Sequence, residues 1–245
     1  MPPGIVAALV AEARILIKGP IAPGGLTVLP EGAMLFISGI GPKRGRLAAQ
    51  ALLAKGATAL VSWGCAGGLL PGLFPGSLIL PERILAADQL VYPADQPWHE
   101  RMSSRLKGYV DPQAGVLAES TIVLASSPEK AALLRRTGAV AVDMESASIA
   151  QVAKEAGIPF LAIRAITDGA EMDIPRSALD STDEFGRIRL LKLFSGLARH
   201  PVELRALLRM GRMFRAAEAT LAKVALRAGS NLLCPYGQDD ACQKS

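Results

Sequence analysis

The sequence is poor in the residues that build metal centres and disulfide frameworks. Its 245 residues include three cysteines, Cys65, Cys234 and Cys242, and two histidines, His99 and His200. The cysteines are odd in number, lack CxxC spacing and have no clustered histidine partner, so neither a disulfide scaffold nor a zinc site is supported. We therefore expect no metal, and a reducing cytoplasm fits this cysteine usage best.

Aromatic side chains and uniform basic charge, the marks of many nucleic-acid-binding proteins, are also scarce. Aromatic residues make up only 4% of the chain. The net charge is +5, but residues 187–227 carry ten basic and two acidic side chains, a local +8 that leaves −3 for the remainder. We therefore expect no nucleic-acid partner and assign the basicity to a C-terminal extension.

Signals for export and for membrane insertion are absent as well. Glu12 and Arg14 interrupt the N-terminal apolar run too early for a signal peptide. The longest uncharged run, residues 56–81, contains six glycines and three prolines, which indicates buried loop and strand instead of a membrane span. A cytoplasmic protein is expected.

Apolar residues are abundant and make up 50% of the chain. Several of them form short runs without helical periodicity. Such runs are typical of parallel strands covered on both faces. They occur at residues 5–9, 33–38, 58–62, 77–80, 140–142 and 160–166, with stretches able to form helices between several of them. This alternation predicts a three-layer αβα fold with a central mixed, mostly parallel sheet.

Two helices have clear expected boundaries. Pro42 suits the first position of a helix through Leu53, because its missing N–H loses no intrahelical bond there. Residues 144–156 carry apolar side chains on one helical face, and Gly157 and Pro159 end that helix.

The chain is predicted to divide near residue 200. A helical pattern begins at residue 187, breaks at Pro201 and then resumes. We expect an α/β domain at residues 1–200, a basic helical extension at 201–234 and a loose polar tail at 235–245. The extension fits either a helix at an anionic membrane surface or an ordinary helix with a solvated basic face.

Three acidic residues follow predicted strands, where open α/β sheets place their ligands. Glu12 comes shortly after the first strand, Glu145 opens the 144–156 helix, and Asp168 follows the 160–166 run. Each also has a simpler explanation, because acids in a first helical turn favour the positive end of the helix dipole and aspartates cap turns and helices. From the residues alone both interpretations stay open.

Two glycine-rich segments also follow predicted strands. Residues 38–45 place glycines before a helix start together with Lys43 and Arg44, which fits anion binding loosely but lacks GxGxxG spacing. Residues 62–68 allow a ligand to approach the backbone closely, or they form only a tight turn.

Taken in order along the chain, these segments resemble the nucleoside phosphorylase family over roughly residues 4–200. The resemblance rests on Glu12, Ser38–Gly41, Gly64–Gly68, Asp143-Met144-Glu145 and Arg164–Asp168. Within the family the sequence is most similar to 5′-methylthioadenosine/S-adenosylhomocysteine nucleosidases, and especially to hopanoid-associated phosphorylases, which carry a basic helical C-terminal extension. The resemblance implies an enzyme that releases adenine from a 5′-substituted adenosine, with adenosylhopane, a lipid-linked nucleoside, as the implied substrate.

The resemblance also implies roles for individual residues. Cleavage of an N-ribosidic bond passes through an oxocarbenium-like sugar, so a site must protonate the base, stabilise the cation and supply a nucleophile. By resemblance Asp168 is the general acid at the purine N7, and burial at the strand end is expected to keep it protonated. Glu145 would accept hydrogen bonds from the ribose hydroxyls, and Met144 would pack under the ribose.

Glu12 bears on the choice between hydrolysis and phosphorolysis. In the nucleosidases that the sequence resembles, a glutamate here holds or deprotonates the attacking water, whereas typical bacterial purine nucleoside phosphorylases have a phosphate-binding arginine. A carboxylate repels phosphate, so hydrolysis is favoured. If phosphate is a co-substrate, Arg14, Lys43 and Arg44 are its expected ligands, and no other cofactor is expected.

The purine side departs from the nucleosidase pattern. An ungapped match puts Ile122 where nucleosidases have a base-stacking phenylalanine, and Val123 where backbone groups pair with adenine. Cys65 replaces a usual serine, next to Ala66 and Gly67 in the implied substrate site. Weaker base stacking is therefore expected.

Two other functions stay open at this point, a phosphorylase of broader purine nucleoside specificity and a nucleoside-binding protein without turnover. The resemblance further implies a homo-oligomer. The basic extension adds peripheral contact with the inner face of the membrane as a hypothesis.

Overall fold

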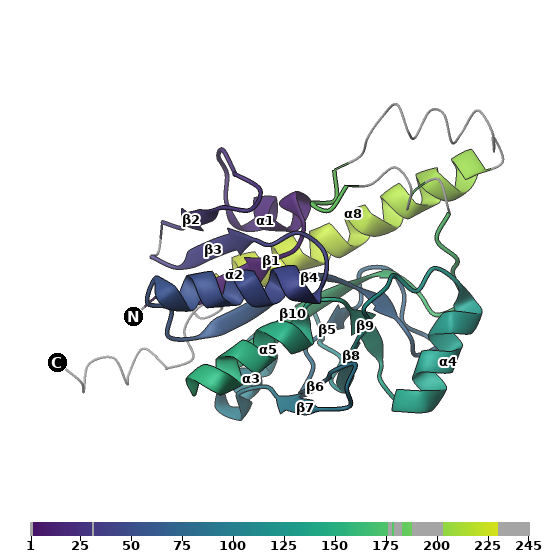
Figure 1. Ribbon diagram of the computed structural model, residues 1–245. Helices are drawn as coiled ribbons and strands as arrows, with labels where there is room; N and C mark the ends of the chain where they lie inside the picture. The colour runs from purple at the N-terminus through teal and green to yellow at the C-terminus, as the bar shows by residue number, and fades with distance from the viewer. Residues whose placement is uncertain (1, 31, 176–177, 179–182, 188–202, 230–245) are drawn as a thin grey trace.

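The computed structural model describes residues 2–30, 32–175, 178, 183–187 and 203–229. Its helices lie on the two faces of a twisted sheet (Figure 1). The strands are β1 (Gly4–Ala7), β2 (Leu26–Val28), β3 (Met34–Ile37), β4 (Leu60–Gly68), β5 (Leu78–Ile79), β6 (Arg83–Leu85), β7 (Val91–Pro93), β8 (Val116–Glu119), β9 (Ala141–Asp143) and β10 (Phe160–Asp168). The helices are α1 (Val10–Leu16), α2 (Pro42–Ala54), α3 (Gln96–Leu106), α4 (Ser127–Thr137), α5 (Ser146–Ala156) and α8 (Glu203–Ala228).

The sheet is mixed, with its longest strands at the centre. The main order is β2-β3-β1-β4-β9-β8-β6-β7, and β10 pairs with β4 and β5. β1 runs parallel to β3 and β4, and β4 runs parallel to β10, whereas β9 pairs antiparallel with the last residues of β4. The predicted αβα fold class is confirmed.

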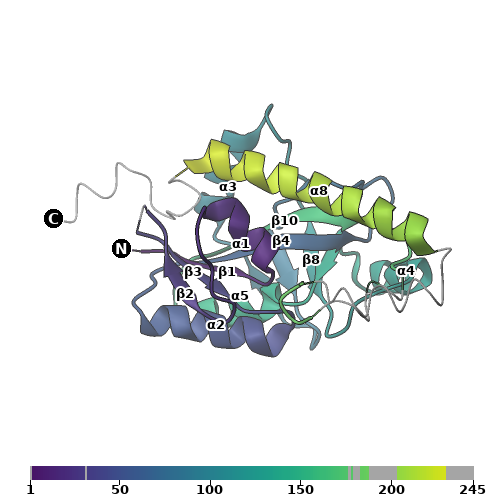
Figure 2. The same ribbon diagram turned by 90° about the horizontal axis from the view of Figure 1, so that it is seen from above.

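Strand side chains alternate between two cores, as the period of two for a strand requires. Ile5 and Ala7 of β1 pack with α1, α3 and α8 on one face, while Val6 packs with α2 and α5 on the other. Figure 2 shows the same arrangement, with α8 lying across the sheet on the side opposite α2. Because helices cover both faces of the sheet, the central strands have apolar side chains on both sides. This explains the continuous apolar runs in the sequence.

The predicted strands are all present, with shifted ends. β4 extends through Gly68, so the segment from residue 62 to residue 68 is strand and not the tight turn considered from the sequence. β10 includes Asp168, and its pairing with β4 shifts register between Ile166 and Asp168.

The predicted helix boundaries hold to within two residues. Pro42 is the first residue of α2, as expected. α5 begins at Ser146 instead of Met144, because Glu145 is its N-cap, and it ends at Gly157 in the left-handed conformation with φ of 64°. Glycine is favoured there because it adopts positive φ without steric cost.

α8 begins within the predicted basic extension but belongs partly to the core. Ala217, Leu221 and Val224 are fully buried against the sheet, and Thr220 Oγ1 donates to the Gly76 carbonyl at 2.7 Å. None of residues 203–212 is buried. The predicted boundary at residue 200, the helical pattern at 188–202 and the tail at 235–245 lie outside the described residues.

Among the helices of the described residues, none combines the length and apolar composition that a membrane crossing requires.

Candidate active site

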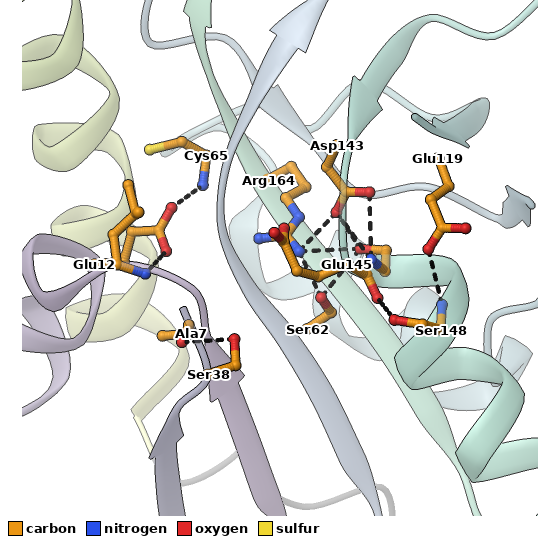
Figure 3. A network of polar contacts seen from close by, with 12 residues as sticks. Ala7, Glu12, Ser38, Ser62, Cys65, Glu119, Asp143, Glu145, Ser148 and Arg164 are labelled. Carbon is orange, nitrogen blue, oxygen red and sulfur yellow. Dashed lines mark hydrogen bonds and ion pairs between the residues drawn. The ribbon is translucent and has the colours of Figure 1, made fainter. Parts of the chain in front are cut away.

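The acids that follow β1, β9 and β10 converge around the second half of β4. This strand runs between β1 and β10, and its last residues pair with β9. Figure 3 shows Glu12, Glu145 and Arg164 directed toward one another from different elements. Residues separated by about 150 positions in the sequence thus form one polar cluster inside an apolar sheet.

Glu12 lies in the first turn of α1 and is 2% exposed. Its Oε2 accepts from the Leu9 N–H at 2.9 Å, which caps α1, and its Oε1 accepts from the Cys65 N–H at 2.7 Å. Burial raises the pKa of Glu12, and the Arg164 guanidinium and these backbone donors oppose the rise. Glu12 therefore caps a helix and also contacts the glycine segment of β4, and its role toward a ligand stays a prediction.

Arg164 is the buried cation at the centre of the cluster. Its Nη2 lies 2.7 Å from Asp143 Oδ2 and donates to the hydroxyls of Ser62 at 2.5 Å and Ser146 at 3.1 Å. The Ser146 hydroxyl in turn donates to Asp143 Oδ2 at 2.5 Å. A buried guanidinium needs such compensation, so these contacts fix the start of α5 against β10.

Gly64 leaves the space that lets Glu12 and Arg164 meet β4. A Cβ at this position would lie within 2.5 Å of the Glu12 carboxyl group and 2.7 Å from Arg164 Nη1. The backbone φ of 151° is also one that residues with a side chain rarely adopt. Glycine at position 64 therefore avoids a clash with Glu12 and Arg164 and also allows the backbone conformation of β4 at this point.

Glu145, the N-cap residue of α5, is also buried and faces the loop before α2. Its Oε1 accepts from the Gly41 N–H at 2.6 Å. Burial and, to a smaller extent, the neighbouring Asp143 carboxylate raise the pKa of Glu145 to about 8, although the Arg164 guanidinium opposes the rise.

Asp168 stands at the end of β10 with a cationic partner that sequence reasoning missed. Lys130 Nζ lies 2.5 Å from Asp168 Oδ2, and Thr167 Oγ1 lies 2.7 Å from Asp168 Oδ1. A Cβ on Gly67 would lie 3.5 Å from Asp168 Oδ2, so the carboxyl rests over the β4 backbone. The sequence-based expectation for Asp168 did not include this ion pair.

The residues predicted to line the substrate pocket differ in burial. Ala66 is buried in β4 and Met144 is half-buried beside Glu145, whereas Ile122 and Val123 are exposed in the loop after β8. Ile122 lines a hollow of about 380 Å³ between that loop and α4. Their roles toward adenine stay predictions.

The predicted phosphate ligands do not form one group among the described contacts. Arg14 is exposed in the last turn of α1, and Lys43 is exposed in the first turn of α2. Arg44 lies 3.7 Å from Glu184 and over the Phe185 ring. Gly41, in the glycine loop considered for anions, instead donates its N–H to Glu145.

Glu119 is a second group that the sequence did not reveal. It ends β8, and its Oε1 accepts from the Ser148 N–H of α5 at 3.1 Å. Burial and, to a smaller extent, the Asp143 carboxylate raise the pKa of Glu119 to about 7. It lines the hollow beside α4 and a second one of about 370 Å³ beside α2.

The described residues contain no group of three or more histidine, cysteine or acidic side chains arranged to hold a metal ion.

Comparisons with known proteins place this arrangement in context. A family model described as the phosphorylase superfamily matches residues 30–199, more than half of the chain. A 5′-methylthioadenosine/S-adenosylhomocysteine nucleosidase from Baumannia cicadellinicola is 30% identical over 168 residues, which cover 60% of this chain and 73% of the relative. The enzyme of the same name from Oceanobacillus iheyensis is 27% identical over 157 residues, covering 56% and 69%.

Solved structures share the fold over nearly the whole chain. The Neisseria meningitidis 5′-methylthioadenosine/S-adenosylhomocysteine nucleosidase in complex with methylthio-immucillin-A superposes with a TM-score of 0.68, at 20% identity, over 92% of this chain and 97% of that one. The Helicobacter pylori futalosine hydrolase superposes with a TM-score of 0.65, at 18% identity, over 91% and 97%. At these identities the likeness concerns the fold.

Proposed function

Because this chain belongs to the phosphorylase superfamily and is an enzyme, we propose that it cleaves the N-ribosidic bond of a 5′-substituted adenosine and releases adenine. One observation carries the proposal. Two carboxyl groups reach β4, Glu12 at the Cys65 N–H and Asp168 over Gly67, and a third, that of Glu145, interacts electrostatically with the buried Arg164. N-ribosidic cleavage needs a proton donor, a carboxylate near the sugar cation and a base for water, and these groups suit those tasks.

Each acid has a distinct part in the proposed reaction. Asp168 gives its proton to the purine N7 as the bond between C1′ and N9 breaks. The oxygen of water attacks C1′, and Glu12 accepts the proton that this water loses. Glu145 accepts hydrogen bonds from the ribose hydroxyls and places negative charge near the developing cation, with Met144 under the sugar. Adenine and a free ribosyl product result.

Hydrolysis is favoured over phosphorolysis by the charge around Glu12. The carboxylate would repel phosphate, and Arg14, Lys43 and Arg44 lie exposed on α1 and α2. Phosphorolysis of ordinary purine nucleosides is the second candidate, since Arg44 and Lys43 begin a helix whose N-terminus attracts anions.

The experiment that tests this proposal is product analysis by mass spectrometry. The enzyme is incubated with methylthioadenosine and with adenosylhopane, each with and without phosphate. Free adenine and an unphosphorylated sugar, independent of phosphate, support hydrolysis with Glu12 as the base. A phosphorylated sugar refutes that role for Glu12, and no adenine from either substrate refutes the adenosine specificity.

The variant Asp168→Asn separates an enzyme from a nucleoside-binding protein. Asparagine has nearly the same shape but carries no acidic proton, so turnover is expected to fall while nucleoside binding persists. Asp111→Asn is a matched control, because it makes the same chemical change at an exposed aspartate outside the site. Equal turnover in Asp168→Asn and the parent contradicts the general-acid role.

Adenosylhopane is proposed as the physiological substrate, by resemblance to the hopanoid-associated phosphorylases. Its lipid group would lie at a membrane surface, and the first three turns of α8 offer a suitable contact. Leu204 and Leu208 are 48% and 60% exposed there, next to exposed Arg205, Arg209 and Arg212. Exposed apolar side chains interleaved with arginines are typical of helices that bind anionic lipid.

Vesicle co-sedimentation tests this contact. The parent is expected to sediment with vesicles containing phosphatidylglycerol and to stay in solution with phosphatidylcholine alone. Leu208→Ser and Arg209→Gln should each weaken sedimentation, whereas Leu226→Ser, at an 80% exposed position near the other end of α8, should not. Equal sedimentation of all four proteins refutes the contact.

A homo-oligomer is proposed on the same resemblance. Leu47 on α2 and Leu90 and Val91 near β7 are exposed apolar side chains that an interface would cover. Light scattering coupled to size-exclusion chromatography measures the mass directly, and a monomer of 25.7 kDa at assay concentrations contradicts the proposal.

A further inference from the structure

Lys130 is a fully buried cation near the N-terminus of α4. Two effects oppose its charge there, because burial removes water and the positive end of the helix dipole repels a cation. Three oxygens compensate for both effects, namely Asp168 Oδ2 at 2.5 Å, the Gly169 carbonyl at 3.0 Å and the Met172 carbonyl at 2.7 Å. An ammonium group has three donors, so every donor of Lys130 is used.

These oxygens belong to the end of β10 and to the segment that directly follows it. Lys130 therefore joins α4 to Asp168 across 38 positions of sequence. On the other side of the carboxyl, Thr167 Oγ1 reaches Oδ1 at 2.7 Å, and the Gly67 backbone lies beneath. With both oxygens engaged, the carboxyl plane has little freedom to rotate.

The other charged groups around this pair have their own partners. Glu129 of α4 accepts from Ser126, and Asp173 accepts from the Ser127 N–H at 2.7 Å. On the β9 side Asp143 is paired with Arg164. The β4 residue opposite Asp168 is Gly67, which carries no charge. Within the described contacts, Lys130 is thus the one cation bonded to Asp168.

We propose that Lys130 is a positioning residue for the general acid: it holds the Asp168 carboxyl in a fixed orientation. This inference rests on the proposed function. Lys130 and Thr167 each engage one oxygen of the carboxyl, so its plane is fixed relative to the base that it would protonate. The geometry also explains why a lysine occupies a fully buried position, where an apolar residue would be less costly.

The test compares kcat and KM for adenine release in the parent and in Lys130→Met, which keeps the length of the side chain and removes its donors. At saturating substrate kcat should fall by about 10- to 100-fold, because the acid is no longer oriented. KM should change by less than kcat, since Lys130 bonds to the acid and to backbone carbonyls.

Two further variants keep the test decisive. Lys130→Gln retains one donor for the Gly169 or Met172 carbonyl and should also lower kcat more than it changes KM, which covers a failure of Lys130→Met to fold. Lys223→Met removes an exposed lysine from the last two turns of α8 and should leave kcat and KM unchanged. A parental kcat in folded Lys130 variants, with only lower thermal stability, refutes the positioning role.

Failure of the inference differs from failure of the proposed function. If the parent releases adenine and its Lys130 variants keep the parental kcat, only the role of Lys130 is refuted. If the parent cleaves no nucleoside, the proposed function is refuted and the inference with it.

Discussion

Replacing Gly64 with alanine adds one methyl group at the most constrained point of the candidate site. The new Cβ would lie 2.4 Å from Glu12 Oε1 and 2.7 Å from Arg164 Nη1. Non-bonded atoms prefer separations of about 3.5 Å, so the carboxylate has to move by about 1 Å. That movement stretches its 2.7 Å hydrogen bond with the Cys65 N–H.

The cost of this substitution has two parts. Overpacking of a buried site costs about 1–3 kcal/mol, and holding alanine at a φ of 151° adds backbone strain of about 1–3 kcal/mol. For a chain of this size each kcal/mol lowers Tm by about 2–4 °C. Adenine release should fall by about 100-fold, since a 1 Å displacement of a catalytic group has effects of that order.

Thermal denaturation followed by circular dichroism, together with the adenine-release assay, measures both effects. Gly72→Ala is the matched control, because Gly72 has a φ of 92° but no atom within 4 Å of an added Cβ. It should show backbone strain without the loss of activity. If Gly64→Ala behaves like Gly72→Ala in both assays, Glu12 does not lie against β4 as described.

Three other substitutions test the charged cluster. Glu12→Gln removes the proposed base and should lower adenine release by about 10²- to 10⁴-fold; near-parental rates refute the assignment. Glu145 has a pKa of about 8 against a usual 4.5, so the folded state retains a proton that the unfolded state loses, and stability should fall as pH rises from about 4.5 to 8. Urea unfolding of Glu145→Gln should show a weaker decline over that interval, and an identical decline contradicts the pKa. Arg164→Met leaves Asp143 buried without its cation and should cost about 3–5 kcal/mol in the same assay; a change below 1 kcal/mol would mean that the pair is solvated.

The sequence predicted the central sheet well because burial on both faces leaves a strong local signal. The runs that became β1, β4 and β10 are continuously apolar, and their carboxyl ends located Glu12 and Asp168. The strands β6 and β7 at one end of the sheet are three residues long, and segments of that length carry too little periodicity to be recognised.

The part of the site that escaped prediction depends on contacts between distant segments. Lys130 stands in an ordinary helical sequence, and only folding brings its ammonium to a carboxyl 38 residues away. Glu119 is distinguished by burial near Asp143, which no local pattern reveals. β4 is also longer than the sequence predicted. It continues through its glycines because β9 and β10 provide hydrogen-bonding partners on its two sides.

The burial of the second half of α8 determines where this protein can be shortened or fused. Thr220 bonds to the Gly76 carbonyl, and the Gly76 N–H bonds to the Ile166 carbonyl at 2.8 Å, two residues before Asp168. Deleting the chain from residue 213 onward would remove part of the core and loosen the strand that carries the acid. The final helix is therefore structurally indispensable, and an affinity tag or a truncation has to leave Met213–Ala228 intact.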